Sequence, residues 1–422
     1  MLANLSSFVD RQILFLLADS IKADLRISDT AMSFLMGTAF AVTYSITGFP
    51  IGRLADYRSR RGIIAWGIAA WSLMCALTGL ARNYTQLFLA RVGVGIGEAT
   101  LSPPAFSLIA DYFPPRRLAS AMSFFGTGIF LGAGFAYFVG GTIIEAFQDM
   151  PPWQLPILGE MRPWQSALVV VGLPGFLIAL LMLTVREPAR TYSGARGHSL
   201  STSATLRYVR RHLGAFSAHG LGIAIFSLVN YGTASWFPSY FMRVHEWSAG
   251  KVGVYMGGAT MIFGTLGIIL GGRAAVWLRA RRQDANLLIG ILGALVSIVA
   301  AFPMYLTRDP AILIAALIVT NVAAAFPWGA ASAAVQEMTP APMRGQASAL
   351  YLFLINIIGF ALGPTAVALL TDGVFRSEAM VGYSLLVVTL VGRSLSAGIL
   401  AAGLGSFRRA VTAAEQWVPQ RS

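Results

Sequence analysis

The sequence predicts an all-α integral membrane protein in which twelve transmembrane helices form two pseudo-symmetric halves of six helices each. Three observations predict this fold: an apolar composition, the regular return of long apolar stretches, and a short motif found at the same place in both halves. Of the 422 residues, 56% are hydrophobic and only 12% are charged, about half the charged share of an average soluble domain. This composition excludes a soluble globule, a disordered chain and a disulfide scaffold.

Apolar stretches of the length that a spanning helix needs, about 20 residues, recur along the whole chain. They lie at residues 2–21, 31–55, 62–81, 84–110, 118–146, 164–185, 214–242, 251–278, 286–306, 311–335, 346–372 and 380–405. The first stretch starts abruptly, and we expect the chain to be truncated, with a cytoplasmic segment missing before it. A cleavable signal peptide is not expected, because Asp10 and Arg11 fall where its apolar region would lie.

Basic residues gather on one side of the predicted membrane. Of the 31 lysines and arginines, 20 fall in loops after even-numbered spans or in the C-terminal tail, 8 fall in the opposite loops, and 3 fall inside spans. Because basic loops stay in the cytoplasm, both termini are predicted to be cytoplasmic. The net charge of +13 therefore indicates the topology of a multi-pass protein of the plasma membrane, the inner membrane of a bacterium, and not nucleic-acid binding.

A long polar interval divides the chain. Residues 1–186 are the predicted N-terminal half, 187–213 a cytoplasmic linker, 214–405 the C-terminal half and 406–422 a cytoplasmic tail. A surface amphipathic helix is expected near the end of the linker. Its arginines could touch anionic lipid headgroups, or they could serve as topology charges alone.

A repeated motif indicates that the two halves are related. The pattern P-x-R-x-x-A-S-A occurs at 114–121 and again at 342–349, each time between the fourth and fifth spans of its half. Since six is an even number of spans, the two halves have the same orientation in the membrane. Two parallel six-helix halves are the architecture of the major facilitator superfamily, which the chain resembles over nearly its whole length.

The loop after the second span, GRLADYRSRR at residues 52–61, resembles the signature cytoplasmic loop of that superfamily. It departs from the pattern at Tyr57, where a basic residue is usual, and at Ser59, where a glycine is usual. Asp56 is expected at a helix end, where it can pair with arginines and helix termini and so latch the two halves on the cytoplasmic side. The residues expected to form this cytoplasmic gate are Gly52, Asp56, Arg60, Arg61 and Arg116.

Further motifs in the N-terminal third resemble the spinster family of the same superfamily. They are Asp10-Arg11 in the first span, the loop at 52–61, and RVGVGIGEA at 91–99 followed by Ser102-Pro103-Pro104. The glycine-rich fifth span also resembles the superfamily, because small residues let helices approach closely. The spinster resemblance implies transport of lipid-like amphiphiles such as lysophospholipids, sphingosine or its phosphate, with proton coupling in some members.

Few charged residues lie inside the predicted spans, and such charges are costly and normally face a partner or a cavity. They are Asp10, Arg11, Arg91, Glu98 and Arg393. Asp10 lies 12 residues from Lys22, and Glu98 lies 14 residues from Tyr84, which places both carboxylates roughly 18–21 Å below the outer surface. The resemblance implies that the first and fourth helices line a central cavity, so the two carboxylates are expected to lie close together.

We expect Asp10 and Glu98 to be the proton-coupling sites, with Arg11 and Arg91 as their charge partners. Burial and a neighbouring carboxylate raise the pKa of a carboxyl group, whereas a nearby arginine lowers it. A carboxyl group balanced between these effects can bind a proton on one side of the membrane and release it on the other. The alternative is a permanent ionic network that only holds the helices together.

The second half carries few charges at membrane depth. This pattern suits an amphiphile whose headgroup lies against the polar first half and whose alkyl chain lies against the second. Arg393 is a candidate ligand for a substrate phosphate or carboxylate, although it could also snorkel or pair with a polar neighbour. Other candidates for the substrate cavity, each of which could instead bond to another helix, are Asn230, Tyr231, Trp236, Asn321 and Asn356.

The predicted function is secondary active transport by alternating access. The expected partners are a small lipid-like amphiphile as the substrate, protons, and the lipids of the membrane. A polyspecific drug/proton antiporter is the alternative within this class. An integral-membrane lipid-modifying enzyme would need a catalytic cluster or metal ligands, and a channel would need a pore-lining ring; neither is evident in the sequence. We expect no enzymatic activity, no cofactor or metal and no nucleic-acid partner, and we expect a monomer.

Overall fold

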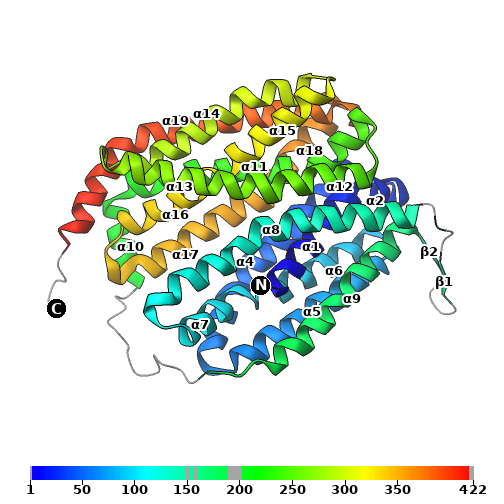
Figure 1. The fold of residues 1–422 in the computed structure, drawn as a ribbon, viewed down its shortest axis with the longest axis horizontal. Helices are drawn as coiled ribbons and strands as arrows, with labels where there is room; N and C mark the ends of the chain where they lie inside the picture. The colour runs from blue at the N-terminus through cyan, green and yellow to red at the C-terminus, as the bar shows by residue number, and fades with distance from the viewer. Residues whose placement is uncertain (1, 149, 151–152, 156–158, 189–201, 418–422) are drawn as a thin grey trace. The chain divides into compact units, whose positions relative to one another are not determined.

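The computed structural model describes residues 2–148, 150, 153–155, 159–188 and 202–417, and these are almost entirely helical (Figure 1). The helices of the first half are α1 (Leu2–Leu16), α2 (Ala18–Leu25), α3 (Asp29–Ser33), η1 (Phe34–Thr38), α4 (Ala39–Tyr57), α5 (Arg60–Gly79), α6 (Tyr84–Glu98), α7 (Ser102–Tyr112), α8 (Pro115–Gln148) and α9 (Pro163–Thr184). Two short strands, β1 (Trp153–Leu155) and β2 (Gly159–Met161), pair antiparallel between α8 and α9. This hairpin was not predicted from the sequence.

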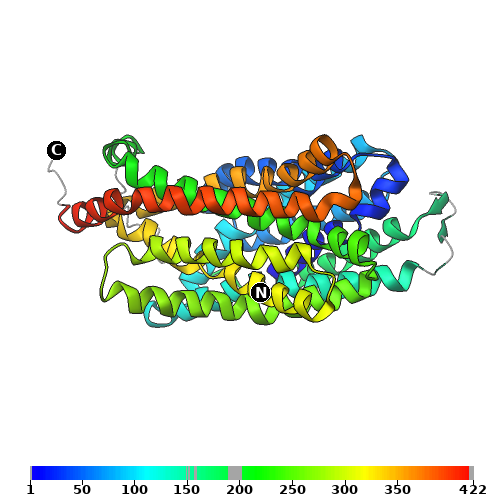
Figure 2. The same ribbon diagram turned by 90° about the horizontal axis from the view of Figure 1, so that it is seen from above.

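The second half repeats the pattern of long helices. Its elements are α10 (Thr202–Arg211), α11 (Leu213–His245), α12 (Ala249–Gly258), η2 (Ala259–Gly264), α13 (Thr265–Arg279), α14 (Ala285–Leu306), α15 (Pro310–Ala325), α16 (Trp328–Glu337), η3 (Ala341–Met343), α17 (Arg344–Leu354), η4 (Ile355–Ala361), α18 (Gly363–Leu369), η5 (Leu370–Phe375), η6 (Glu378–Met380) and α19 (Val381–Glu415). Helix α19, red to orange in Figure 2, is unbroken over 35 residues.

Within the described part of the chain, ten helices are long and apolar enough to cross a membrane. The other two predicted spans are each divided by a break. The first is divided at Leu17, between α1 and α2, and the fourth is divided between Glu98 and Ser102. With these two broken helices the structure accounts for twelve spans, and the predicted all-α membrane fold is confirmed.

The break in the fourth span has a local cause. Helix α7 has prolines in its first turn, at Pro103 and Pro104, and proline has no N–H to continue the hydrogen bonds of α6. The backbone therefore turns through residues 99–101, with Leu101 N–H bonded to the carbonyl of Glu98 at 3.1 Å. Glu98 consequently stands at the last residue of α6.

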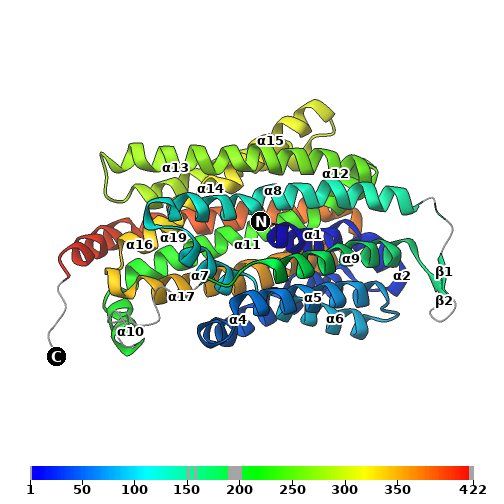
Figure 3. The ribbon, with the colours of Figure 1, turned by 60° about the horizontal axis from the view of Figure 1, so that its bottom comes forward.

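Contacts between Cα atoms divide the chain into two compact units. The first unit comprises Met1–Thr191, Ala234–Met261 and Pro364–Ser384. It therefore joins the first six spans to the C-terminal end of α11, to α12, and to the segment from α18 to η6. Helices α5, α6 and α9 pack together in this unit (Figure 3). Its largest fully buried side chains include Trp71, Phe40 and Ile13.

Small residues bring α8 and α12 together within the first unit (Figure 1). A Cβ atom built on Gly141 would lie 2.6 Å from the carbonyl oxygen of Ala249 and 2.9 Å from Cα of Gly253. These distances leave no room for a side chain. The glycines of the fifth span therefore serve close helix packing, as the sequence indicated.

The second unit comprises Tyr192–Thr233, Ile262–Gly363 and Leu385–Ser422. Its core contains Ile223, Leu287, Tyr351, Leu400 and Phe407. Helix α10 lies in the predicted linker and docks on this unit, where the hydroxyl of Tyr208 donates a hydrogen bond of 3.2 Å to the carbonyl of Met338. Residues 189–201 of the linker and 418–422 of the tail lie outside the described residues. The four-part division of the chain stays a prediction.

Many large apolar side chains point outward from both units. Trp66, Leu177, Val276 and Val299 are each more than half exposed, as are other leucines and valines along the same helices. A surface this apolar would be unstable in water and is typical of helices that face lipid.

Candidate functional site

Four of the charged residues predicted inside the membrane meet in the first unit. Asp10 and Arg11 project from α1, and Arg91 and Glu98 project from α6. Asp10, Arg91 and Glu98 each retain only 1% of their accessible surface. We refer to these four residues as the central charge cluster.

Glu98 is the best-bonded member of the central charge cluster. Its Oε2 atom accepts hydrogen bonds from Ser7 Oγ at 2.5 Å and from Arg11 Nε at 2.7 Å, and Arg11 Nη2 is also within bonding distance. The Arg11 guanidinium stacks 4.4 Å from the ring centroid of Phe40. Ser7 and Arg11 are four residues apart and so lie on one face of α1. The other carboxylate oxygen of Glu98, Oε1, is buried without a hydrogen-bond partner among the described residues.

Asp10 is bonded quite differently. Neither of its carboxylate oxygens has a hydrogen-bonding partner with an N–H or O–H group in the described part of the chain. Arg91 Nη1 instead donates to the backbone carbonyl of Asp10 at 3.4 Å, and Arg91 Nε and Nη2 are buried without a hydrogen-bond partner among the described residues. The thiol of Cys75 lies beside the Asp10 carboxyl group, and Glu98, Arg91 and Arg11 are its charged neighbours. Among the described residues, the cluster thus holds one firm ion pair and one carboxyl group that lacks N–H and O–H donors.

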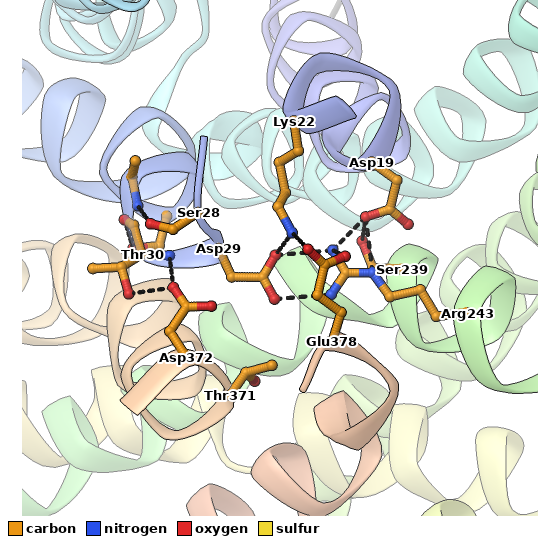
Figure 4. A network of polar contacts seen from close by, with 12 residues as sticks. Asp19, Lys22, Ser28, Asp29, Thr30, Ser239, Arg243, Thr371, Asp372 and Glu378 are labelled. Atoms are coloured by element: carbon orange, nitrogen blue, oxygen red, sulfur yellow. Dashed lines mark hydrogen bonds and ion pairs between the residues drawn. The ribbon is translucent and has the colours of Figure 1, made fainter. Parts of the chain in front are cut away.

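A second group of charges lies in the same unit, at the end predicted to face outward (Figure 4). We call it the outer ion-pair network, and it consists of Asp19, Lys22, Asp29, Thr30, Ser239, Arg243, Asp372 and Glu378. Asp19 and Lys22 come from α2, and Asp29 and Thr30 from α3. Ser239 and Arg243 come from α11, Asp372 from η5 and Glu378 from η6. The network therefore connects helices of the first half to helices of the second.

Asp29 is the centre of the outer ion-pair network. Its fully buried carboxylate pairs with Lys22 and, at 2.8 Å, with Arg243 Nη1. Lys22 also reaches Glu378 at 2.9 Å, and the Nε of Arg243 donates to Asp19 at 2.9 Å. Next to Asp29 in the chain, the backbone N–H and the hydroxyl group of Thr30 both donate to Asp372 Oδ2 at 2.7 Å. Sequence reasoning missed this network, because it counted Lys22 and Arg243 as topology charges only.

The predicted cytoplasmic gate is described in part. Arg60 is buried and pairs with Asp111 and, at 3.0 Å, with Glu187, and it donates to Ser107 Oγ at 3.0 Å. The Arg61 backbone N–H donates to Glu187 at 3.0 Å. Asp111 and Ser107 belong to the first half, and Glu187 is the first residue of the predicted linker. Asp56 and Arg116 lie outside the residues whose side chains are described, and a Cβ on Gly52 would lie 4.0 Å from Pro103.

Glu187 lies just beyond α9 and holds the start of α5. It accepts hydrogen bonds from Ser59 Oγ at 2.6 Å and from the backbone N–H groups of Arg60 and Arg61. Burial raises the pKa of Glu187, but these bonds and the Arg60 side chain outweigh it and lower the pKa to about 2. Ser59, the departure from the usual glycine, is thus the N-cap of α5.

The candidates of the second half are bonded mainly to other helices. Arg393 is buried in α19 and bonds to the Phe226 carbonyl at 2.9 Å and to Asn230 Oδ1. Asn356 lies in η4 and is partly buried. The remaining three candidates have hydrogen-bonding or stacking partners. Asn321 donates to the carbonyl of Leu317, Trp236 donates to the carbonyl of Pro364, and Tyr231 stacks on Phe360 at 4.6 Å. A metal site is not formed by His, Cys, Asp and Glu within the described ranges.

The fold and the buried charges define a multi-pass helical membrane protein built from two six-span halves. Residues 1–364 match the model of the Major Facilitator Superfamily, and the chain belongs to this superfamily of membrane transporters. The predicted resemblance is therefore confirmed.

Individual relatives place the chain near the spinster proteins. It is 28% identical to an MFS-type efflux pump of Mycolicibacterium smegmatis over 87% of this chain and 81% of that protein. It is 24% identical to spinster homolog 1 of Xenopus tropicalis, over 92% and 76% of the two chains. It is 23% identical to the sphingosine-1-phosphate transporter SPNS2 of the same species, over 92% and 77%.

A solved structure supports the same placement. The crystal structure of a bacterial homolog of the human lysosomal transporter spinster, in an inward-facing and unoccupied conformation, superimposes with a TM-score of 0.79. The two chains are 25% identical, and the match covers 99% of this chain and 97% of the other. The chain is thus a transporter of the Major Facilitator Superfamily that is similar to spinster proteins.

Proposed function

We propose that the chain is a proton-coupled secondary transporter of lipid-like amphiphiles, and that its halves, residues 1–186 and 214–405, move against each other during transport. The observation that carries the proposal is the central charge cluster. Two carboxyl groups are buried at one place, yet only Glu98 has a direct ion pair, with Arg11. A set of charges this costly inside a membrane is expected to serve function.

The bonding of Glu98 suggests how a proton changes the site. While it is ionised, Glu98 holds Arg11 and Ser7 on one oxygen atom. When Glu98 binds a proton, its attraction for Arg11 falls and the guanidinium becomes available to another anion. A lysophospholipid or a sphingosine phosphate carries such an anion in its headgroup. Proton binding and headgroup binding are then linked through Arg11.

Asp10 completes the charge balance. When both acids are ionised, the formal charges of the two carboxylates and the two arginines of the cluster sum to zero. A proton on Asp10 would neutralise a buried carboxylate that has no N–H or O–H donor in the described structure, which relieves a desolvation cost. Asp10 and Glu98 are therefore our candidates for the two proton positions, with Arg11 and Arg91 as the groups that bias them.

The outer ion-pair network supports alternating access. It joins the first-half helices α2 and α3 to second-half elements, so it must separate whenever the outer side opens. We assign it the role of an outer gate, with Asp29 at its centre. At the opposite end we assign the role of cytoplasmic gate to Gly52, Asp56, Arg60, Arg61 and Arg116. The arginine-rich loops support a cytoplasmic position for this end and for both termini.

The proposed substrate class rests on relatives and on charge. One relative is named a sphingosine-1-phosphate transporter, and an anionic amphiphile suits a polar first half and an apolar second half. A second candidate function is drug/proton antiport, which the efflux pump of Mycolicibacterium smegmatis favours. Both candidates use the same proton site and differ in the substrate alone.

Proteoliposomes test the proposal and separate the two candidates. The purified chain is reconstituted with labelled lysophospholipid, sphingosine phosphate, ethidium or a sugar, with and without a pH gradient. We expect accumulation of the anionic lipids that depends on the gradient. We also expect that Glu98→Gln keeps downhill exchange but loses accumulation, while the exposed control Glu160→Gln behaves as the wild type. Full accumulation by Glu98→Gln and by Asp10→Asn would refute the proton site, and transport of ethidium alone would favour drug antiport.

A further inference from the structure

Arg393 is a buried cation without a counter-charge. Only 3% of its surface is accessible, and it forms no ion pair with any acidic side chain that the structure describes. Its guanidinium donates to two neutral acceptors, the Phe226 carbonyl and Asn230 Oδ1, and lies 3.6 Å from the ring centroid of Phe226. Asn230 in turn donates to the carbonyl of Ala324 at 3.0 Å. A full positive charge inside an apolar bundle normally requires a negative partner.

A small cavity lies beside Arg393, entirely within the second unit. Its volume is about 20 Å³, and its lining combines Arg393 with the hydroxyl side chains Thr233, Ser297, Tyr305, Thr320 and Thr389. No carboxylate lines it. Helices α11, α14, α15 and α19 each contribute to this lining.

Several polar groups around the cavity have no hydrogen-bond partner in the described structure. They are Arg393 Nε, Thr320 Oγ1 and Thr389 Oγ1, all of them buried. Thr233 and Ser297 instead bond to carbonyls of their own helices, at 2.8 and 2.7 Å. Unsatisfied buried polar groups are rare and need an explanation. Here a guanidinium N–H and two hydroxyl groups, all able to donate, line one cavity.

We propose that this cavity binds a single small inorganic anion of the halide class, chloride in a cell, as the counter-ion of Arg393. The volume holds one occupant of about the size of a water molecule and is too small for a phosphate or carboxylate headgroup. A water molecule would accept the same hydrogen bonds but would leave the positive charge unbalanced. The anion would hold the four helices together and is separate from the central charge cluster of the first unit.

Thermal unfolding of the purified full chain tests the proposal. The protein is exchanged into sodium gluconate, and chloride is then added at constant ionic strength. We expect a saturable rise of the Tm with chloride and with bromide. Thr389→Val removes one donor to the anion. We therefore expect that the chloride concentration at which the Tm has risen by half of its full increase becomes about tenfold higher.

Two further variants make the test decisive. Arg393→Met should abolish the chloride effect, whereas the exposed Arg409→Met, on the same helix, should keep it. If Arg393→Met does not fold, Thr389→Val alone carries the test. A Tm that is the same in gluconate and chloride would overturn the proposal, as would a chloride effect that both Arg393→Met and Thr389→Val retain unchanged. Transport measurements are not needed, so the proposed function can fail without affecting this result.

Discussion

Arg11 on α1 and Glu98 on α6 form the direct ion pair of the central charge cluster, with Arg11 Nε 2.7 Å from Glu98 Oε2. The carboxyl group of Asp10, next to Arg11 in the chain, has no N–H or O–H donor within the described residues. Two buried acids of one cluster are thus bonded in unlike ways. This difference is the basis of the proposal that they are the proton sites, because Glu98 has a direct ion pair and the Asp10 carboxyl group has none among the described residues.

Removing Arg11 should destabilise the protein. Among the described residues, Arg11→Met leaves the buried Glu98 carboxylate with Ser7 alone as a donor, and breaking one side of a buried ion pair costs about 3–5 kcal/mol. The double variant Arg11→Met/Glu98→Gln removes both charges and should recover most of that loss. Thermal unfolding in detergent measures both effects. Equal stability of wild type and Arg11→Met would show that the pair contributes nothing.

Weakening the outer ion-pair network should open the outer side more often. Asp29→Asn removes the buried charge that Lys22 and Arg243 share, so the network should lose most of its strength. Glu378→Gln should have a smaller effect, because the Glu378 side chain is 63% exposed and exposed ion pairs contribute little.

A thiol probe measures this opening. Ser239, buried on α11, is replaced in Ser239→Cys on a Cys75→Ser background and is labelled with a membrane-impermeant maleimide from outside. Labelling should be several-fold faster when Asp29→Asn is added and nearly unchanged when Glu378→Gln is added. Equal labelling rates in all backgrounds would argue against a role of the network as a gate.

Glu187 should stabilise the predicted cytoplasmic end in a pH-dependent way. Its pKa is about 2 in the folded protein against an ordinary 4.5. A lowered pKa means that the folded state favours the ionised form, so the stabilisation is present above about pH 4.5 and is lost as the pH falls toward 2. The Tm of Glu187→Gln should therefore lie below that of the wild type at pH 7, and the two values should converge in acid. A difference that stays constant from pH 7 to pH 3 would contradict the ionic contribution.

Close packing of α8 on α12 should tolerate no side chain at Gly141. Gly141→Ala places a methyl group 2.6 Å from the Ala249 carbonyl, and forced overpacking of this kind costs about 1–3 kcal/mol. Gly258→Ala, on the facing helix α12, is the control, because a Cβ there meets nothing within 4 Å. The Tm should fall for Gly141→Ala and should stay level or rise slightly for Gly258→Ala. The reverse order would contradict the packing shown by the structure.

Hydropathy alone was sufficient to predict the twelve spans, because a membrane imposes the same length on every helix. It could not show the breaks at Leu17 and after Glu98, since an average over about 20 residues does not register where the backbone turns. The expectation that Asp10 and Glu98 lie close together followed from counting helical rise along two spans and from the resemblance, and the structure brings them into one cluster. Their neighbour Ser7 was overlooked, although its spacing of four residues from Arg11 on one helix was a usable signal.

The outer ion-pair network could not be derived from the sequence. Asp29 and Arg243 are 214 residues apart, and each lies at the end of an apolar stretch, where a charge is unremarkable. Their pairing depends on how the first half meets α11, which no local pattern encodes. The same holds for Arg393. Its neutral partners come from another helix, α11, and its lack of an acidic partner among the described residues could be seen only in the structure.

Substrate-driven proton movement tests the central claim most directly. Proteoliposomes enclose a fluorescent pH indicator, no pH gradient is imposed, and a gradient of labelled lysophospholipid is applied. Proton coupling predicts a change of internal pH that accompanies lipid movement in the wild type and in Glu160→Gln. The change should be absent in Asp10→Asn and in Glu98→Gln, although both variants still move the lipid down its gradient. Lipid movement with the same pH change in both variants would contradict the assignment of Asp10 and Glu98 as the proton sites.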